Sequence, residues 1–390
     1  MPGQRQYFPA LDPLRAIAFL LVYSAHIGPS SGTAGHIYTW TGPSDLGPIG
    51  LNLFFVLSGF LITCLLLAEQ QEGQRIQITN FYIRRMLRIW PIYFLIVGIS
   101  QFLIPVTGLF GLNDFYGIHT PNFMRASICY LLFLPNYAFM AIAPVNPLLA
   151  HTWSIGAEEQ FYLLWPHVLQ KGRRWLEPIL WSIIVLAMLS SWIYDYGWSH
   201  PMGGGSIWRA VHKTGTAIYW TNMGFFALGG LMAYYRANRP GIVRRLSGPL
   251  AQALVLPLSV ILIVNGKNLA EGWVPALLFA IIVLQATLPS TLIGRLRHPW
   301  LIYLGKISYG LYIFHILVIA LISRAWANSP IPPGLGYWLI PILALAATVV
   351  VAALSYHFIE RFFLRQRKRF EPVVGSPVAN VRPISSHARL

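Results

Sequence analysis

The sequence predicts an all-α membrane protein, a polytopic bundle of about ten transmembrane helices with one re-entrant or half-inserted segment. Of its 390 residues, 56% are hydrophobic and 10% are charged, whereas about a quarter of the residues of a soluble domain are charged. Several apolar runs reach the roughly 20 residues that a helix needs to cross the hydrocarbon layer. Basic residues gather in alternate segments between these runs, as the loops of a polytopic protein require.

The first part of the chain predicts three crossings. The first is expected near residues 13–29, with Pro13 in its first turn, where a proline is tolerated. The second is expected near residues 50–68 and is followed by the polar segment EQQEGQRIQITNFYIRRMLR. The third is expected over residues 89–106.

Two segments then compete for a single crossing. Arg125 belongs to an outer loop and the cluster at Lys171 to an inner one, so an odd number of crossings separates them. Residues 126–145 are apolar but interrupted by a Pro-Asn pair, whereas residues 152–170 carry two glutamates. We expect residues 152–170 to cross and residues 126–145 to be re-entrant, because irregular backbone is tolerated in a membrane where it lines a protein cavity.

The remainder of the chain predicts six further helices, near residues 176–196, 215–235, 249–265, 273–290, 306–325 and 336–360. No internal repeat at a fixed period is found, which weighs against an inverted-repeat transporter. Residues 1–365 are therefore expected to form one membrane domain. Residues 366–390, rich in Arg, Lys, Ser and Pro, are expected to be a disordered cytoplasmic tail.

The net charge of +16 follows from this topology. The segments that we place inside carry most of the basic residues, in clusters near residues 75–88, 171–174, 236–245, 295–306 and 361–369. The positive-inside rule then puts both termini in the cytoplasm and the chain in the inner membrane, and no nucleic-acid partner is expected. Cys64 and Cys129 lie in apolar runs and are interpreted as buried thiols, so neither a disulfide nor a metal site is predicted.

An ionisable pair marks the first helix. Arg15 and His26 are 11 residues apart, which puts them on one helix face, about 16 Å apart along the axis. Ionisable groups inside a membrane helix are costly and are usually functional. Asp12 can pair with Arg15 and also suits the helix N-terminus. The alternative is that Arg15 reaches one membrane interface and His26 lies at the other.

A second polar group lies in the segment HTWSIGAEEQFYLLWP. Glu158 is four residues after Ser154 and four before Tyr162, so the three side chains share a helix face. His151 lies just upstream, and Glu159 points about 100° away around the helix. Ser154 as a helix cap with acids in the first turn is the structural alternative. It does not account for two carboxylates so near the hydrocarbon.

Two further clusters complete the candidates. Arg84, Arg85 and Arg88 in FYIRRMLRIWP lie on the expected cytoplasmic side. They either serve topology alone or form a phosphate clamp. The clamp is chemically suited to them because guanidinium groups bind phosphate bidentately.

In GKISYGLYIFHI, Ser308, Tyr312 and His315 form one polar stripe on a helix, either for interhelical hydrogen bonding or for function. Ser58 has no GxSxG elbow around it, so a soluble-hydrolase mechanism has no support.

Together these segments resemble the integral-membrane acyltransferase family three, the bacterial O-acyltransferases that modify polysaccharides and secondary metabolites. The matching text is LDPLRAIAFLLVYSAH, GLNLFFVLSGFLIT, FYIRRMLRIWPIYFL, HTWSIGAEEQFYLLWP, ISYGLYIFHI and SYHFIERFF. The resemblance implies transfer of an acyl group, most often acetyl, from cytoplasmic acyl-CoA to a hydroxyl. It also implies that Arg15 and His26 match an arginine and a histidine that the family needs for activity.

A mechanism can be written with these residues. We expect Arg84, Arg85 and Arg88 to hold the phosphates of CoA. His26 is the expected general base and Glu158 the group that orients or charge-stabilises it. Arg15 could steady the thioester carbonyl, bind phosphate or organise Asp12, and an acyl-histidine is an alternative route. The assignment requires Arg15 and His26 to line one cleft.

Two other functional classes compete with this hypothesis. A transporter or flippase for an anionic metabolite or lipid-linked sugar would use the same buried ions and basic mouth. A structural partner of a polysaccharide synthase would leave the Arg15–His26 stripe unexplained. For an enzyme, the acceptor stays open among a saccharide, a lipid-linked glycan and a macrolide hydroxyl.

Overall fold

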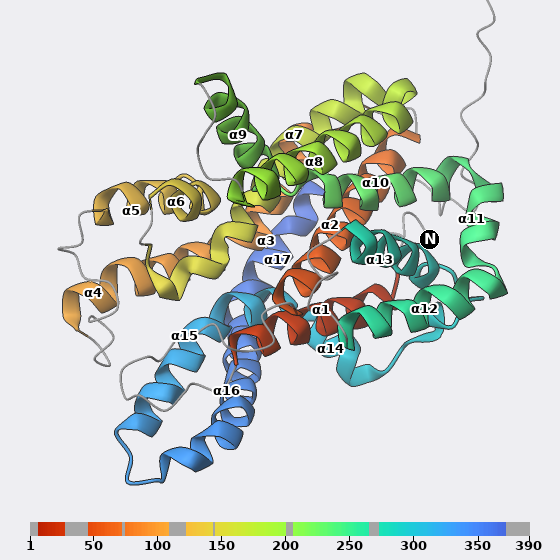
Figure 1. Ribbon diagram of the computed structural model, residues 1–390. Helices are drawn as coiled ribbons and strands as arrows, with labels where there is room; N and C mark the ends of the chain where they lie inside the picture. Colours follow the sequence, from red (N-terminus) through yellow and green to blue (C-terminus); the bar gives the residue numbers. More distant parts are fainter. Residues whose placement is uncertain are drawn as a thin grey trace, which may run out of the picture.

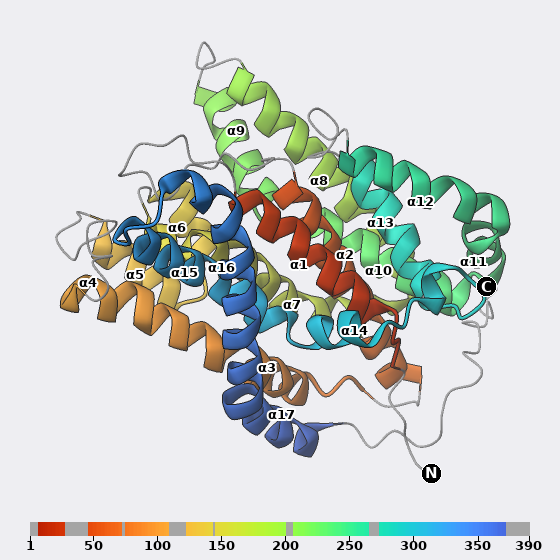
Figure 2. The same ribbon diagram turned by 90° about the horizontal axis from the view of Figure 1, so that it is seen from below.

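The computed structural model describes residues 7–27, 46–71, 75–108, 122–142, 145–199, 206–264 and 273–371. Within these ranges every regular element is a helix, which confirms the all-α class (Figures 1 and 2). The α-helices are α1 (Leu11–His26), α2 (Leu46–Gln71), α3 (Ile78–Val97), α4 (Ile104–Thr107), α5 (Phe123–Leu131), α6 (Pro135–Ala141), α7 (Trp153–Gly172), α8 (Leu176–Ser199), α9 (Ser206–Tyr219), α10 (Met223–Asn238), α11 (Pro240–Ser247), α12 (Pro249–Val264), α13 (Trp273–Ala286), α14 (Pro299–Lys306), α15 (Ser308–Ala327), α16 (Pro333–Ser355) and α17 (Arg361–Arg367).

The helices make this a multi-pass membrane protein. Among the described residues, five helical segments are long and apolar enough to cross a membrane, or six if the bent pair α11 and α12 is one span. They are Leu46–Gln70, Ile78–Thr107, Pro147–Gly197, Ser308–Ala327 and Trp338–Phe370. The expected number of ten is not confirmed, because α1, α10 and α13 have only 16, 16 and 14 residues and because α7 and α8 count as one segment. A helix of 16 residues rises about 24 Å, less than the hydrocarbon thickness of about 30 Å.

The third of these segments contains two helices, α7 and α8, joined by a short helical turn at Arg173–Trp175. A methyl group placed on Gly230 of α10 would lie 3.0 Å from Leu180 of α8 and 3.3 Å from Trp165 of α7. Fifteen residues of straight helix would separate those two side chains by about 22 Å. The chain therefore turns back at the position where the sequence predicts a loop.

In two segments the observed helices differ from the predicted ones. Residues 126–145 contain most of α5 and all of α6, which have nine and seven residues. A nine-residue helix rises only about 14 Å, too little to cross. The predicted single helix over 215–235 is wrong, since the chain breaks at residues 220–222 between α9 and α10. Asn222 there has φ 53°, a left-handed conformation that asparagine tolerates and that ends a helix.

The C-terminal helical region extends further than predicted. After α17 a short helical turn, Lys368–Phe370, follows where the disordered tail was expected to begin. α17 and this turn both pack against α3. The rest of the predicted tail, residues 372–390, lies outside the described residues.

The centre of the bundle is formed by α1, α2 and α10, with α1 and α2 side by side in both views (Figures 1 and 2). A Cβ atom on Gly59 of α2 would lie 2.0 Å from the carbonyl oxygen of Phe226, and one on Gly229 of α10 would lie 2.0 Å from that of Val56. The two backbones therefore touch, as small residues allow between membrane helices. Ser58 is the neighbour of Gly59 on α2, so this contact fixes its position relative to α10. Ser58 is part of the pocket described below.

We expect Gly59→Ala to destabilise the protein by about 1–3 kcal/mol, because α2 and α10 must separate to admit the methyl group. Gly98→Ala is the matched control, since a Cβ atom there would meet nothing within 4 Å. Thermal unfolding of both variants in detergent measures the difference. Equal melting temperatures would show that the two backbones are not in contact.

Candidate active site

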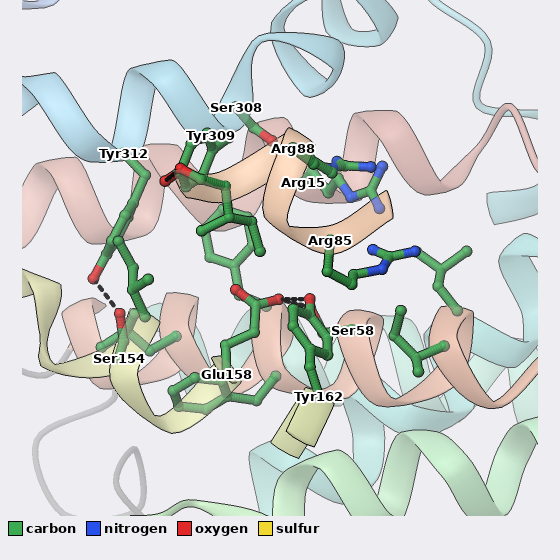
Figure 3. A pocket seen from close by; sticks show the side chains of 17 residues that line it. Arg15, Ser58, Arg85, Arg88, Ser154, Glu158, Tyr162, Ser308, Tyr309 and Tyr312 are labelled. Atoms are coloured by element: carbon green, nitrogen blue, oxygen red, sulfur yellow. Dashed lines mark hydrogen bonds between the residues drawn. The ribbon is translucent and has the colours of Figure 1, made fainter. Parts of the chain in front are cut away.

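A pocket lies between α1, α2, α3, α7 and α15 (Figure 3). Its empty volume is about 770 Å³, the open mouth included. It is lined by Arg15, Leu51, Phe54, Phe55, Ser58, Leu61, Ile62, Arg85, Arg88, Ile89, Ser154, Ile155, Glu158, Tyr162, Ser308, Tyr309 and Tyr312. Segments far apart in the sequence thus bring charged, hydroxyl and apolar groups together.

Three arginines gather at one end of the pocket, Arg15 from α1 and Arg85 and Arg88 from α3 (Figure 3). Arg85 lies over the rings of Phe81 and Tyr162, with its guanidinium carbon 5.5 and 5.4 Å from the ring centroids. Cation–π contacts of this kind hold a guanidinium in place without neutralising its charge. This end of the pocket is therefore suited to an anionic ligand.

Asp12 positions Arg15, as the sequence predicts. Arg15 Nη1 lies 3.1 Å from Asp12 Oδ1, and the hydroxyl of Tyr7 donates to Asp12 Oδ2 at 2.5 Å. Burial, together with this hydrogen bond, raises the pKa of Tyr7 to about 12. The phenol therefore keeps its proton at neutral pH and continues to donate it to Asp12.

Arg84 is not part of this basic end, which corrects the predicted clamp of three arginines. Its Nη2 lies 2.5 Å from Glu69 Oε1, and its Nη1 donates to the carbonyl oxygen of Phe370 at 2.7 Å. The Arg84 side chain is only 1% exposed. The buried carboxylate at the end of α2 thus holds Arg84 away from the pocket, and the clamp is reduced to Arg85 and Arg88.

Glu158 occupies the middle of the pocket (Figure 3). Its Oε1 accepts hydrogen bonds from Ser58 Oγ, at 2.5 Å, and from the hydroxyl of Tyr162. The predicted pairing of Glu158 with Tyr162 on one helix face is therefore present. The role of Ser58 was missed, because its partner lies 100 residues away and its local sequence carries no motif. Glu159 does not line the pocket.

Ser154 and Tyr312 close the opposite end (Figure 3). The hydroxyl of Tyr312 donates to the carbonyl oxygen of His151 at 2.7 Å. The hydroxyl of Tyr312 also lies 2.6 Å from Ser154 Oγ, which itself lies 3.3 Å from the same carbonyl oxygen. Tyr312 is thereby held by two partners.

The three predicted histidines form a cluster beyond Tyr312. The ring of His26 is centred 5.0 Å from that of His315, which is 5.1 Å from that of His151. Tyr312 packs against the other side of the cluster, 5.4 Å from His151 and 5.6 Å from His315. Arg15 therefore lines the pocket but His26 does not, so the expectation that both line one cleft is not met.

Backbone carbonyls define the protonation of His26 and His315. His26 Nδ1 lies 2.8 Å from the carbonyl oxygen of Val22, and His315 Nδ1 lies 2.6 Å from that of Tyr312. Because a carbonyl only accepts, each Nδ1 carries a proton, and Nε2 is the basic atom of each neutral ring. Within the described chain, no group of three or more His, Cys, Asp or Glu side chains is arranged to hold a metal ion.

A bundle of membrane-crossing helices surrounds a pocket with arginines at one end and the half-buried Glu158 at its centre, a site suited to a membrane enzyme that acts on an anionic substrate. The family model described as an acyltransferase domain, of acyltransferase family three, matches residues 8–357. The chain belongs to this family of membrane acyltransferases.

Relatives carry names that agree with the family. The chain is similar to the peptidoglycan O-acetyltransferase OatA of Listeria monocytogenes, with 29% identity over 376 residues, 91% of this chain and 56% of the relative. It is also similar to a Staphylococcus aureus protein whose name as an O-acetyltransferase is provisional, with 26% identity over 387 residues, 93% of this chain and 58% of the relative. The chain thus spans somewhat more than half the length of these relatives. No solved structure matches it significantly.

Proposed function

We propose that the protein is a membrane-bound O-acyltransferase that moves an acyl group, acetyl in the first instance, from acyl-CoA to a hydroxyl of a saccharide. The observation that supports this most directly is the single pocket that holds Arg15, Arg85, Arg88 and Glu158. The acetyl group and the saccharide acceptor are also in line with the peptidoglycan O-acetyltransferase named among the relatives. A lipid-linked glycan or a macrolide offers the same reacting group.

Arg85 and Arg88 are proposed to bind the phosphates of CoA, with Arg15 as a third positive charge at the same end. Guanidinium groups match phosphate in geometry and in charge. We take α3 with its arginines, and both termini, to lie on the cytoplasmic side of the inner membrane, in line with the positive-inside rule. Acyl-CoA from the cytosol would then enter at the arginine end and extend toward Glu158.

The reaction needs a base for the acceptor hydroxyl and a site for the thioester. His26 is proposed as the base, with Nε2 taking the proton while the acceptor oxygen bonds to the acyl carbon. Because His26 does not line the pocket, this step requires the thioester to pass Tyr312 and reach the histidine cluster. The carbon–sulfur bond then breaks, and the same proton passes to the CoA thiolate. Glu158 is not assigned as the group that orients His26, because His26 Nδ1 bonds to the Val22 carbonyl and Glu158 lines a pocket that His26 does not, while its Oε1 is bonded to Ser58 and Tyr162. It is proposed instead to align those two hydroxyls around the thioester.

Inside-out membrane vesicles supplied with labelled acetyl-CoA and a saccharide acceptor test the proposal. Release of free CoA together with labelled acceptor is expected. Uptake of label without release of CoA would instead identify a carrier. Neither release nor uptake, in vesicles shown to contain folded protein, would also contradict the acyltransferase proposal.

Replacing Arg85 or Arg88 with glutamine is expected to weaken CoA binding by about 10–100-fold at low salt, because each change removes a hydrogen-bonded charge from a phosphate. The loss should shrink as salt is raised, because salt screens the interaction that has been removed. Titration of CoA in detergent at several salt concentrations measures this. Arg297→Gln is the matched control, since it removes the same charge from an exposed position outside the pocket. An equal loss in the control would argue against the clamp.

A further inference from the structure

The proposed donor site and the proposed base lie on opposite sides of Tyr312. The arginines and Glu158 lie in the pocket, which ends at Tyr312 and Ser154 (Figure 3). His26 lies beyond that end, in the histidine cluster. A thioester whose phosphates are held by the arginines therefore reaches the base only when the Tyr312 ring moves aside.

The hydroxyl of Tyr312 is held by two groups, one in α7 and one in the turn before it. It donates to the carbonyl oxygen of His151 at 2.7 Å and lies 2.6 Å from Ser154 Oγ. Ser154 Oγ also lies 3.3 Å from that carbonyl oxygen, so the three groups form one small network. A neutral hydrogen bond favours one arrangement over another by only about 2–10-fold. The network is therefore strong enough to bias the position of Tyr312 and weak enough to open.

His151 also offers the Tyr312 hydroxyl a second acceptor. His151 Nε2 lies 3.3 Å from the carbonyl oxygen of Ile313, so Nε2 carries the proton and Nδ1 is an acceptor. This Nδ1 is buried and has no hydrogen-bond partner in the part of the chain that the structure describes. The rings of His151 and Tyr312 are centred 5.4 Å apart. A hydroxyl that leaves the carbonyl oxygen can therefore donate to the imidazole of the same residue, which gives a buried acceptor the donor that it lacks.

The donor needs protection from water at the base. His26 is only partly buried, so water as well as an acceptor hydroxyl can reach it. If the thioester lay beside His26 without an acceptor, a water oxygen would bond to the acyl carbon and the carbon–sulfur bond would break. The proton would pass through Nε2 to the CoA thiolate, with free acid and CoA as products. Enzymes suppress such side reactions by keeping water from the reacting group.

We propose that the hydroxyl of Tyr312, with Ser154 Oγ and the carbonyl oxygen of His151, forms a latch that keeps the thioester on the Glu158 side while no acceptor is bound. The inference rests on the proposed function, since it requires acyl-CoA as donor and His26 as base. When the latch opens, the Tyr312 ring moves aside and the thioester reaches the histidine cluster. Ser154 is a positioning residue that holds the hydroxyl of Tyr312.

Hydrolysis of labelled acetyl-CoA without any acceptor tests the latch, with purified full-length protein in detergent at saturating acetyl-CoA. Tyr312→Phe keeps the ring and removes the hydroxyl, so release of labelled acetate and free CoA should rise about 2–10-fold above the wild type. Tyr93→Phe is the matched control. It also removes a buried phenol that donates to a carbonyl, that of Tyr130 at 2.8 Å, but outside the pocket and the histidine cluster. Its hydrolysis should stay at the wild-type level.

A double variant shows whether the added hydrolysis runs through the base. Tyr312→Phe combined with His26→Ala should lose the increase, because the water is no longer deprotonated. Unchanged hydrolysis in Tyr312→Phe, or an increase that persists in the double variant, would overturn the latch, while transfer by the wild type would leave the proposed function intact. If Tyr312→Phe does not fold, Ser154→Ala takes its place with the same expected and overturning results. Absence of CoA release from the folded wild type even with an acceptor would overturn both proposals.

Discussion

Replacing His26 with alanine is expected to lower the rate of acyl transfer by about 10²–10⁴-fold, the usual contribution of a general base. The reason is geometric as well as chemical. Val22 binds the proton on Nδ1, so the basic Nε2 belongs to a neutral imidazole that can accept the proton of the acceptor hydroxyl. Alanine removes this atom and leaves the deprotonation to water.

The measurement is CoA release with an acceptor, normalised to the amount of folded protein. His26→Gln can keep a hydrogen bond to the Val22 carbonyl but offers no basic nitrogen, so it should be as inactive as alanine. His298→Ala, at an exposed histidine outside the cluster, should retain wild-type activity. Full activity of a well-folded His26→Ala protein would remove His26 from the mechanism.

Local geometry explains which parts of the site could be predicted. Asp12 with Arg15, and Glu158 with Tyr162, are pairs three and four residues apart on one helix, and helix periodicity alone puts them in contact. The bond between Ser58 and Glu158 joins two helices 100 residues apart. Nothing in the local sequence of either residue identifies the other.

The arginine cluster shows where periodicity is insufficient. Arg84, Arg85 and Arg88 satisfy the positive-inside rule equally well, and the helix places Arg84 closer in angle to Arg88 than to Arg85. The structure nevertheless pairs Arg85 with Arg88 in the pocket and gives Arg84 to Glu69. Glu69 on α2 determines that Arg84 stays out of the pocket, and the position of Glu69 relative to α3 is a property of the tertiary fold.

The fold, like the site, could be predicted where the signal is local and could not where it is not. Apolar runs predicted the helical class and most helix positions, because hydrophobicity over about 20 residues is a strong signal. They did not predict the break at Asn222 between α9 and α10, since the flanking residues remain apolar and a single left-handed residue leaves little trace in composition.

The assignment of Arg84 as structural leads to the second large effect. Glu69→Ala is expected to lower the free energy of unfolding by about 3–5 kcal/mol, because it leaves a guanidinium that is 1% exposed without its carboxylate. Thermal unfolding in detergent measures the loss. Glu177→Ala is the matched control: it breaks an ion pair with Arg239 of similar length, 2.7 Å, but with side chains 52% and 23% exposed. Such exposed pairs contribute about 0–1 kcal/mol.

Removing both charges tests whether Arg84 serves stability alone or also binds CoA. The double variant Glu69→Leu with Arg84→Met should recover most of the stability, since a buried ion pair can be replaced by apolar groups of similar volume at little cost. Its affinity for CoA should equal that of the wild type, because Arg85 and Arg88 remain in the pocket. If the double variant is stable but binds CoA as weakly as Arg85→Gln, then Arg84 contacts the ligand, and the predicted clamp of Arg84, Arg85 and Arg88 is correct. Arg84 and Arg85 are neighbours of identical chemistry, so their different functions come from their surroundings: a carboxylate beside Arg84, and two aromatic rings and the pocket beside Arg85.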